Sequence, residues 1–458
     1  MTSRTQHPRL SRRGLRALGR TAAAALTIGA VGIALVGCSS GGGSGDGAKE
    51  ISIINRWSDP IGKAAAEEMF DAFTAETGIT VKNNSQPSSG DTYQPAVRSA
   101  LSSSNAPSLA VDNAGPDTFE FAKSGAILDI TDFFNSTLAD RSTAGATSGE
   151  EYDGKIYGIS AGAVVGNLIW YNPDYLAEYG VDASTITTYE EWIAAMQKIK
   201  DAGGTPIVLG AKDQWPGGHY LNDFVQRALG SEKTTALYDR TVKAGQPDSP
   251  KWTDPEVVQA FQDYVDMKPL FQDGFLGEAQ ATADSLFLGG DVGFYEMGSW
   301  FLTAIQNANP DFKPGVMLFP ALEDGEGSGT EVTLGNDSLM VSADADPEAA
   351  QAFLEFFTRP DVAAKFGAAT SKIMPYKIDT SLSTVPDVIA PQWDAINAFA
   401  SDAGDGGAAL FNDQAIDVNI YQKYIWQGSV GLMSGEITPK ELAEQLEQAT
   451  VDAQKANG

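Results

Sequence analysis

Cysteine and histidine, which carry much of enzyme chemistry, are scarce in this sequence. Cys38 is the only cysteine among 458 residues, and His219 is the only histidine after it. These counts argue against Cys/His zinc sites and against most Ser-His-Asp arrangements unless His219 serves them. We expect no catalytic residues, no metal centre and no cofactor. An oxygen-only calcium site stays open, although the acidic loops at 323–326 and 402–405 lack EF-hand spacing.

Tryptophans, carboxylates and amides stand at the ends of predicted strands. Open α/β sheets bind ligands at the carboxyl ends of their strands. The predicted strands cover 50–55, 108–111, 207–209 and 291–295, with a further strand pair around 335–341. The candidate binding residues are Trp57, Asp59, Asp112, Asn113, Trp215, His219, Glu296, Trp300, Asn336 and Asp337. Of these, Trp215 and His219 are expected in a polar aromatic loop over 210–220.

The segments between these residues alternate between strand and helix patterns. Asp59 and Pro60 form a typical helix start, and apolar residues at helical spacing follow until Gly78. Thr188 to Glu191 resembles a capping box for a helix that buries Trp192. The alternation predicts an α/β fold with mostly parallel sheets, and the length favours two domains. Trp170, Trp252, Trp393 and Trp426 are interpreted as packing residues, with a binding role left open for Trp426.

The start of the chain has the pattern of an export signal. Six arginines and no acidic residue precede Cys38, an apolar run covers 21–37, and a Gly/Ser-rich stretch follows. The run is short for a membrane-spanning helix, which needs about 20 residues. Leu35-Val36-Gly37-Cys38 resembles a bacterial lipobox. We expect 1–38 to be a lipoprotein signal peptide ending at lipidated Cys38 and 39–50 to be a flexible tether. Sec and Tat export both stay open.

The charge of the chain is strongly negative. The formal net charge is -29, and the first 38 residues hold six of the 31 basic residues and none of the 60 acidic ones. Such a field repels nucleic acid and anionic lipid and slows the arrival of anionic ligands. A neutral or cationic small ligand fits best, although acidity can also serve solubility alone.

The chain resembles extracellular solute-binding protein family 1, the carbohydrate-binding components of ABC importers, to which maltose-binding protein belongs. The resemblance covers nearly all of the mature chain and depends on the order of several short motifs. Besides the lipobox, they are Trp57-Ser58-Asp59, Gly125 to Ile130, Gly154 to Gly158, Trp170-Tyr171-Asn172, Thr188 to Trp192, Met297 to Trp300, Ala352 to Pro360 and Ser434 to Glu441. One departure is Pro107-Ser108, where the family often has Pro-Asp.

The resemblance implies a two-lobed periplasmic-binding-protein fold of type II, with ligand held between the lobes. It places three hinge crossings near Ser160 to Val165, Phe319-Pro320 and Met374-Pro375. Lobe 1 would then comprise 51–160 and 320–373, and lobe 2 would comprise 161–319 and 374–458. Trp300 resembles the family's stacking tryptophan. A sugar site needs such aromatic platforms beside amide or carboxylate partners.

The function implied by the resemblance is capture of a mono- or oligosaccharide for import. The expected partners are the carbohydrate and the transmembrane subunits of an ABC permease, and the expected form is a monomer. The lipid would anchor it at the outer face of the cytoplasmic membrane. Two alternatives stay open: a secreted glycoside hydrolase, for which Asp59 with Glu296 is the best pair of carboxylates, and a receptor of the same fold for a non-sugar ligand such as a polyamine.

Overall fold

The structure is a computed structural model that describes residues 49–457, apart from 88–91, 144, 243–247 and 404–406. These described residues form one compact unit. The predicted signal peptide, its lipidation site Cys38 and all but the last two residues of the predicted tether lie outside the described residues.

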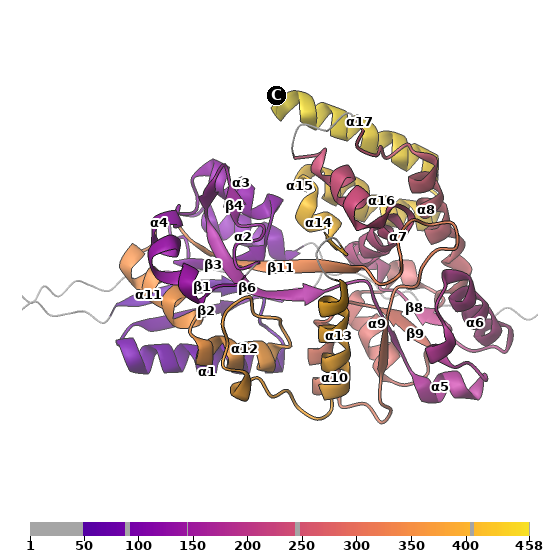
Figure 1. The fold of residues 1–458 in the computed structure, drawn as a ribbon, viewed down its shortest axis with the longest axis horizontal. Helices are drawn as coiled ribbons and strands as arrows, with labels where there is room; N and C mark the ends of the chain where they lie inside the picture. The colour runs from indigo at the N-terminus through magenta and orange to yellow at the C-terminus, as the bar shows by residue number, and fades with distance from the viewer. Residues whose placement is uncertain (1–48, 88–91, 144, 243–247, 404–406, 458) are drawn as a thin grey trace, which may run out of the picture. The chain divides into compact units, whose positions relative to one another are not determined.

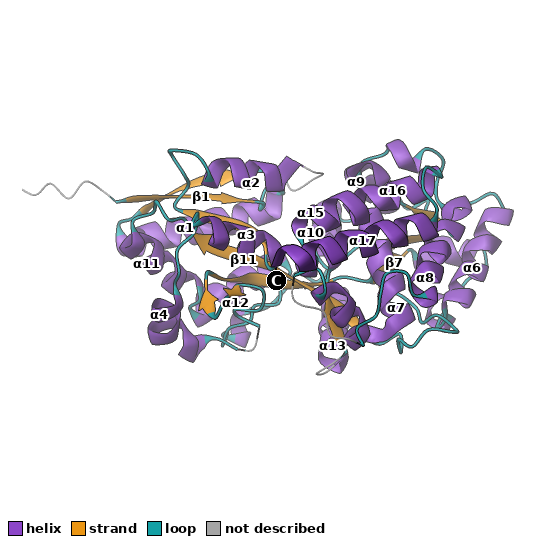
Figure 2. Ribbon diagram, turned by 90° about the horizontal axis from the view of Figure 1, so that it is seen from above, coloured by secondary structure: helices purple, strands orange, loops and turns teal. Residues whose placement is uncertain are grey.

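Two mixed sheets organise the described chain, and we call the elements packed around them lobe 1 and lobe 2 (Figures 1 and 2). The lobe 1 sheet has the order β12-β11-β3-β1-β2, with β6 also paired to β11. Its strands are β1 (Glu50–Asn55), β2 (Thr80–Ser85), β3 (Leu109–Asn113), β6 (Gly158–Val165), β11 (Val332–Val341) and β12 (Ala408–Leu410). The lobe 2 sheet has the order β10-β7-β9-β8, formed by β7 (Leu168–Tyr171), β8 (Ile207–Val208), β9 (Phe294–Glu296) and β10 (Gly315–Leu318).

The pairing of these strands corrects one prediction. β1 runs parallel to β2 and β3, and β8 runs parallel to β9, as alternating strands and helices would require. However, β11 is antiparallel to β3 and β6, and β7 is antiparallel to β9 and β10. The α/β class is confirmed, but the sheets are mixed rather than mostly parallel.

Helices cover both sheets. Lobe 1 carries α1 (Pro60–Thr77), α2 (Tyr93–Leu101), α3 (Pro116–Ser124), α4 (Thr131–Phe133), η2 (Phe134–Leu138), η3 (Ala139–Arg141), α11 (Pro347–Phe357), α12 (Pro360–Thr370) and η8 (Thr380–Leu382), and the small hairpin β4 (Glu151–Tyr152) and β5 (Lys155–Ile156). Lobe 2 carries α5 (Pro173–Glu178), η4 (Ala183–Thr185), α6 (Tyr189–Asp201), η5 (Ala211–Asp213), α7 (Trp215–Asp239), α8 (Pro255–Asp266), η6 (Lys268–Leu270), η7 (Phe275–Gly277), α9 (Gln280–Leu288), α10 (Phe301–Ala308), α13 (Ala390–Ala403), α14 (Asn412–Ala415), α15 (Val418–Ile420), the π-helix η9 (Tyr421–Trp426), α16 (Gln427–Ser434) and α17 (Pro439–Asn457).

Local sequence signals set several helix boundaries as predicted. Asp59 caps α1 by accepting hydrogen bonds from the backbone N–H groups of Ile61 and Gly62, and Gly78 ends the helix in the left-handed conformation. The capping box of α6 forms between Thr188 and Glu191. Both helices bury the apolar face that their spacing predicts.

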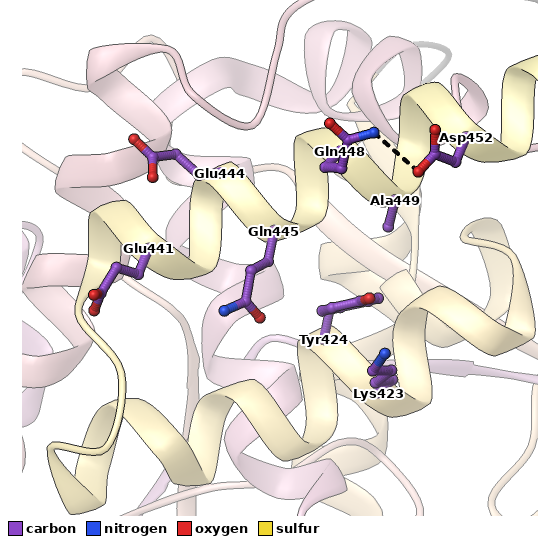
Figure 3. Close-up of a pocket in the computed structure, with 8 residues that line it drawn as sticks. All are labelled: Lys423, Tyr424, Glu441, Glu444, Gln445, Gln448, Ala449 and Asp452. Atoms are coloured by element: carbon purple, nitrogen blue, oxygen red, sulfur yellow. Dashed lines mark hydrogen bonds between the residues drawn. The ribbon is translucent and has the colours of Figure 1, made fainter.

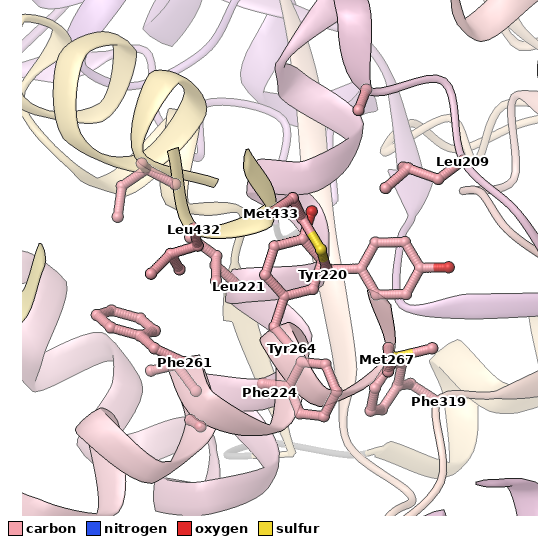
Figure 4. Packing of buried hydrophobic residues seen from close by; sticks show 14 of the residues in the cluster. Leu209, Tyr220, Leu221, Phe224, Phe261, Tyr264, Met267, Phe319, Leu432 and Met433 are labelled. Atoms are coloured by element: carbon pink, nitrogen blue, oxygen red, sulfur yellow. The ribbon is translucent and has the colours of Figure 1, made fainter. Parts of the chain in front are cut away.

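Each lobe has its own aromatic core. In lobe 2, Trp192 contacts Phe294 and Phe319 edge to face, and Tyr220 stacks on Tyr264 with ring centroids 5.6 Å apart (Figure 4). Trp170, Trp192 and Trp252 are fully buried and Trp426 is 4% exposed, so their assignment as packing residues is confirmed. In lobe 1, Phe73 contacts Phe353 and Phe356 edge to face.

Strands β6 and β11 belong to both lobes. They pair along their length, with a register shift at which Ala161 and Gly162 of β6 lie opposite Asp337 alone. Gly162 has a φ of +118°, a conformation that suits glycine at such a bulge. The first residue of β11, Val332, packs in the lobe 2 core, whereas Leu339 and Val341 pack in the lobe 1 core.

The first predicted crossing, near Ser160 to Val165, falls on β6, and we propose later positions for the other two. Arg227 of α7 binds both the carbonyl oxygen of Phe319 and Glu331, so the chain is still on lobe 2 at 331. The second crossing then lies within β11 rather than at Phe319-Pro320. After Met374-Pro375 the chain still contacts lobe 1, where Asp379 N–H donates to the carbonyl oxygen of Pro360. It joins the lobe 2 core at Val385, which places the third crossing between 379 and 385.

The lobe 1 core gives a stability prediction. Phe73 is fully buried between two other rings, so Phe73→Ala should leave a cavity and lower the free energy of unfolding by about 3 to 5 kcal/mol. Urea denaturation measures the change. Leu286→Ala is the control because Leu286 is 39% exposed, and it should change stability by less than about 0.5 kcal/mol. Equal effects of both substitutions would contradict the assignment of Phe73 to the core.

Candidate functional site

Four aromatic rings gather where lobe 2 meets the shared strands. His219 stacks on Phe411 with centroids 4.5 Å apart and lies 4.9 Å from Trp215. Trp300 lies 6.0 Å from Trp215, 5.8 Å from His219 and 5.9 Å from Phe411. We call these four residues the aromatic group. The structure thus brings together three of the predicted site residues and adds Phe411.

Two glycines, one in β11 and one just after β6, leave room for the ring of Phe411. Its ring lies over Gly166, just after β6, and over Gly335 in β11, and a Cβ atom at either glycine would fall against the ring. Its backbone N–H donates to the carbonyl oxygen of Leu334, which extends the pairing of β12 with β11. The sequence contains the two glycines, but it does not indicate which aromatic residue fills the space above them.

Trp215 and His219 lie on helix α7, which corrects the prediction of a loop over 210–220. The turn before the helix is the short η5, followed by Gln214 with a φ of 65°, and Pro216 occupies the first turn of α7. Gly217 and Gly218 are poor helix formers, so the sequence does not indicate a helix at this point. Glycine is needed at both positions because Ser429, Tyr264 and Trp426 pack against them. His219 is only 5% exposed, and its Nε2 lies 3.8 Å from a carboxylate oxygen of Asp413.

Trp300 occupies the position before α10 and is only partly buried. Its indole N–H donates to the sulfur of Met297 at 3.0 Å. Gly298 lies directly beneath the ring, which leaves no space for a side chain there. This turn holds the indole plane in one orientation, as a stacking platform requires. Contact with a ligand stays a prediction.

A network of charges forms in lobe 1 at the ends of β1 and β3 and in the middle of β11. Arg56 donates to Asp112 at 2.9 Å and to Asn113 at 3.0 Å, and it lies 3.6 Å from Asp337. Lys372 forms an ion pair with Asp337. We call these five residues the polar network. Asp112, Asn113 and Asp337 were candidates from the sequence, whereas Arg56 and Lys372 were missed because nothing in the local pattern pairs residues so distant in sequence.

The network is balanced in charge. Burial alone would raise the pKa of Asp337, but Lys372 and Arg56 hold it below its ordinary value. Burial raises the pKa of Asp112 despite the attraction of Arg56, and its Oδ2 has no hydrogen-bond partner. Two cations therefore face two carboxylates, and the side chain of Asp337 is largely committed to them.

Asn336 connects the two shared strands. Its side-chain amide donates to Glu150 at 2.8 Å and its side-chain oxygen accepts from the hydroxyl of Ser160. Its backbone N–H donates to the side-chain oxygen of Gln414 at 2.8 Å. The residue is 6% exposed, and its polar atoms are engaged in contacts with Ser160, Glu150 and Gln414. Contact of Asn336 with a ligand stays a prediction.

Asp59 and Trp57 have structural roles in lobe 1. Oδ1 of Asp59 accepts both of the hydrogen bonds that cap α1. It also accepts a hydrogen bond from the side chain of Asn307 in α10 at 3.3 Å. Trp57 is 3% exposed and its ring contacts Phe70 and Phe366. The indole of Trp57 therefore packs in the lobe 1 core, and a binding role for either residue stays a prediction.

Glu296 is a buried carboxylate of lobe 2. It is 2% exposed at the end of β9, and neither of its carboxylate oxygens has a hydrogen-bond partner. Burial raises its pKa well above the ordinary value, and the charge of Asp223 raises it further. Asp59 contacts the start of α1 and Asn307, so the two carboxylates proposed for hydrolysis have no contacting residue in common.

Two surface grooves lie away from these residues. One, of about 390 Å³, separates η9 from α17 and is lined by Lys423, Tyr424, Glu441, Glu444, Gln445, Gln448, Ala449 and Asp452 (Figure 3). The other, of about 150 Å³, lies between α1 and α12. Neither is lined by a residue of the aromatic group or of the polar network.

Two further features bear on partners. Within the described part of the chain, no three His, Cys, Asp or Glu side chains are arranged to hold a metal ion. Of the helices between 49 and 457 that the structure describes, none has both the length and the apolar character needed to cross a bilayer.

Glu296 gives a pH prediction. Its raised pKa in the folded state means that it favours folding below its unfolded pKa, near 4.5, and that this stability is lost as pH rises towards the folded pKa. Glu296→Gln removes this titration. The unfolding free energy of the variant relative to wild type should then grow above pH 4.5 by up to about 1.4 kcal/mol per pH unit. Urea denaturation across pH 4 to 8 measures it, with exposed Glu68→Gln as the control. A difference that does not vary with pH would contradict the prediction.

Comparison with known proteins agrees with this architecture. A family model described as bacterial extracellular solute-binding protein matches residues 57–364. The osmoprotective compounds-binding protein GgtB of Synechocystis sp. is 25% identical over 374 residues, which cover 78% of this chain and 83% of that protein. A probable sugar-binding periplasmic protein of Rhizobium meliloti is 26% identical over 298 residues, or 60% of this chain and 65% of that one.

The solved structures add the fold. One described as a chitin oligosaccharide binding protein has a TM-score of 0.75 and 21% identity, and the similarity covers 89% of this chain and 99% of that one. The predicted two-lobed fold is thereby confirmed. The family model spans more than half of the sequence, and the chain therefore belongs to the bacterial extracellular solute-binding proteins.

Proposed function

We propose that this protein is the substrate-binding lipoprotein of an ABC importer, which captures a mono- or oligosaccharide between its lobes and delivers it to the membrane permease. The observation that carries the proposal is the pairing of an aromatic group in lobe 2 with a charge-balanced polar network in lobe 1. Sugar rings offer weakly apolar faces to aromatic planes and hydroxyl groups to amides and carboxylates. Relatives named as sugar-binding proteins support the same ligand class.

The polar network favours a neutral ligand over a polyamine. A polyamine needs unpaired carboxylates, but Asp112 and Asp337 already face Arg56 and Lys372. Glu296 is buried and its pKa is raised, which favours its neutral form. Neither carboxylate of the polar network is therefore left without a cation for a polyamine to bind. Hydroxyl groups, which both donate and accept hydrogen bonds, suit such a balanced network.

A hydrolase is the less favoured alternative. Glycoside hydrolysis needs two carboxylates about 5 to 10 Å apart on either side of one bond. Glu296 is enclosed by the lobe 2 core near Asp223 and Tyr220, whereas Asp59 caps a lobe 1 helix. Their separate surroundings support binding without turnover.

The ligand class can be tested by calorimetric titration. We expect binding of at least one neutral sugar from a panel of galactose, raffinose, maltotriose, xylotriose and chitotriose, and no binding of spermidine. Product analysis of the same mixtures should find the sugars intact. Binding of spermidine alone would overturn the sugar proposal, and cleavage of an oligosaccharide would favour the hydrolase.

Trp300 should be a binding residue rather than a core residue. Trp300→Ala removes an aromatic platform, so affinity for the sugar identified by titration should fall by about 1 to 3 kcal/mol, roughly 5- to 150-fold. Trp393→Ala is the matched control, because Trp393 is a partly buried lobe 2 tryptophan outside the aromatic group. Calorimetry and urea denaturation are measured together. Unchanged affinity with a stability loss of about 3 to 5 kcal/mol would identify Trp300 as packing.

Cys38 should determine membrane attachment. We expect Cys38→Ala to give a folded protein that is released from the membrane, because the proposed acyl group would be lost while lobes 1 and 2 keep their cores. Fractionation with immunoblotting measures the distribution, and Cys38→Ser serves as a second variant with a similar volume. Retention of both variants at the membrane would contradict lipidation at this residue.

A further inference from the structure

A buried contact joins the two lobes at helix α3. Asp117, in the first turn of α3, accepts a hydrogen bond from the hydroxyl of Tyr421 in η9 at 2.9 Å. The other oxygen of the same carboxylate accepts from Arg98 of α2 at 2.7 Å. Asp117 is 1% exposed and Tyr421 is 0% exposed. Asp117 belongs to lobe 1, whereas Tyr421 packs in the lobe 2 core, where its ring lies 5.0 Å from that of Trp426.

The backbones of the two lobes also approach closely here. Gly115, which precedes α3, has a φ of +83° and lies against the carbonyl oxygen of Gln414 in α14, so that no side chain would fit. The side chain of Gln414 accepts a hydrogen bond from the backbone of Asn336 in the shared strand β11. Figure 1 draws α3 beside the α14–α15 segment, and α14 contacts α3. The contact is therefore connected to the strand about which the lobes would turn.

Burial of Asp117 is unfavourable, whereas its hydrogen bonds are favourable. Burial raises the pKa of Asp117 to about 8, with Asp112 and Asp413 raising it and Arg98 and Tyr421 lowering it. Enclosing this carboxylate costs desolvation free energy, and the two hydrogen bonds offset it.

We propose that the hydrogen bond between Tyr421 and Asp117 is an interlobe latch that sets the population of the closed arrangement. Tyr421 supplies the donor from lobe 2, and Arg98 holds the acceptor in place from lobe 1. The π-helix η9 supports this assignment, since single π-helical turns are frequent at functional positions.

Another interlobe hydrogen bond is weaker. Asn307 of α10 donates to Asp59 at 3.3 Å, and the bond is exposed to solvent. Water competes for such a bond, whereas the bond of Asp117 is enclosed and accepts two donors. The buried hydrogen bond therefore contributes more to the stability of the closed arrangement than the exposed one. The exposed bond forms when the buried one has brought the lobes together.

Hydrogen exchange of the full chain tests the latch without any ligand. Tyr421→Phe keeps the ring against Trp426 and removes only the hydroxyl group. We expect amide exchange to become roughly tenfold faster in α3 and α14 and also in α10, because opening separates both interlobe contacts. Tyr424→Phe is the matched control, since Tyr424 belongs to the same π-helix but faces the groove towards α17 (Figure 3). It should leave exchange in all three helices unchanged.

A second variant tests the acceptor. Asp117→Ala removes the acceptor of the hydrogen bond from Tyr421, and it should accelerate exchange in the same helices. Combining it with Tyr421→Phe should add little, because both changes remove one interaction. Acceleration confined to α3 would mean local loosening and would overturn the proposal, as would unchanged exchange in Tyr421→Phe. Thermal unfolding of each variant identifies any global loss of stability, and a loss large enough to explain the exchange would also count against the latch.

Discussion

The pairing of β6 with β11 is the interaction on which the rest of the structure depends. These strands are the only described pair whose residues pack in the cores of both lobes. Three consecutive residues of β11 connect them to the candidate site. Gly335 makes room for Phe411, Asn336 binds Ser160 and Glu150, and Asp337 binds Lys372 near Arg56. A shift of one residue in this register would displace the aromatic group and the polar network together.

The buried carboxylates show how an acidic chain keeps a packed interior. Asp337 has a cation within the same lobe, which holds its pKa below the ordinary value, and the guanidinium of Arg227 pairs with Glu331. Glu296 has no cation, so its pKa rises and the neutral form is favoured instead. Because the charges of lobe 1 are balanced within lobe 1, separating the lobes would not leave an unpaired charge at the polar network. Internal balance of this kind makes hinge motion inexpensive in electrostatic free energy.

Local signals in the sequence predicted the elements that depend on local interactions. The cap at Asp59 and the capping box at Thr188 act within one helical turn, and both formed as expected. The start of helix α7 was missed because Gly217 and Gly218 are poor helix formers. Glycine is required at these positions because Ser429 and Trp426, about 200 residues later in the sequence, pack against them. The mixed sheets were missed for the same kind of reason, since strand direction is set by which distant strand becomes a neighbour. Arg56 and Phe411 have no local signal at all.

The candidate binding residues were predicted at the ends of strands. In the structure they form two groups, one in each lobe. Trp215, His219 and Trp300 are fixed to lobe 2 through α7 and the turn before α10, whereas Asp112, Asn113 and Asp337 are fixed to lobe 1 through Arg56. Each group is held by contacts inside its own lobe. Under the proposed function, a sugar would add contacts between two surfaces that are each already formed. Its differential affinity for the closed arrangement would then come from bridging the lobes, because neither surface has to be rebuilt on closure.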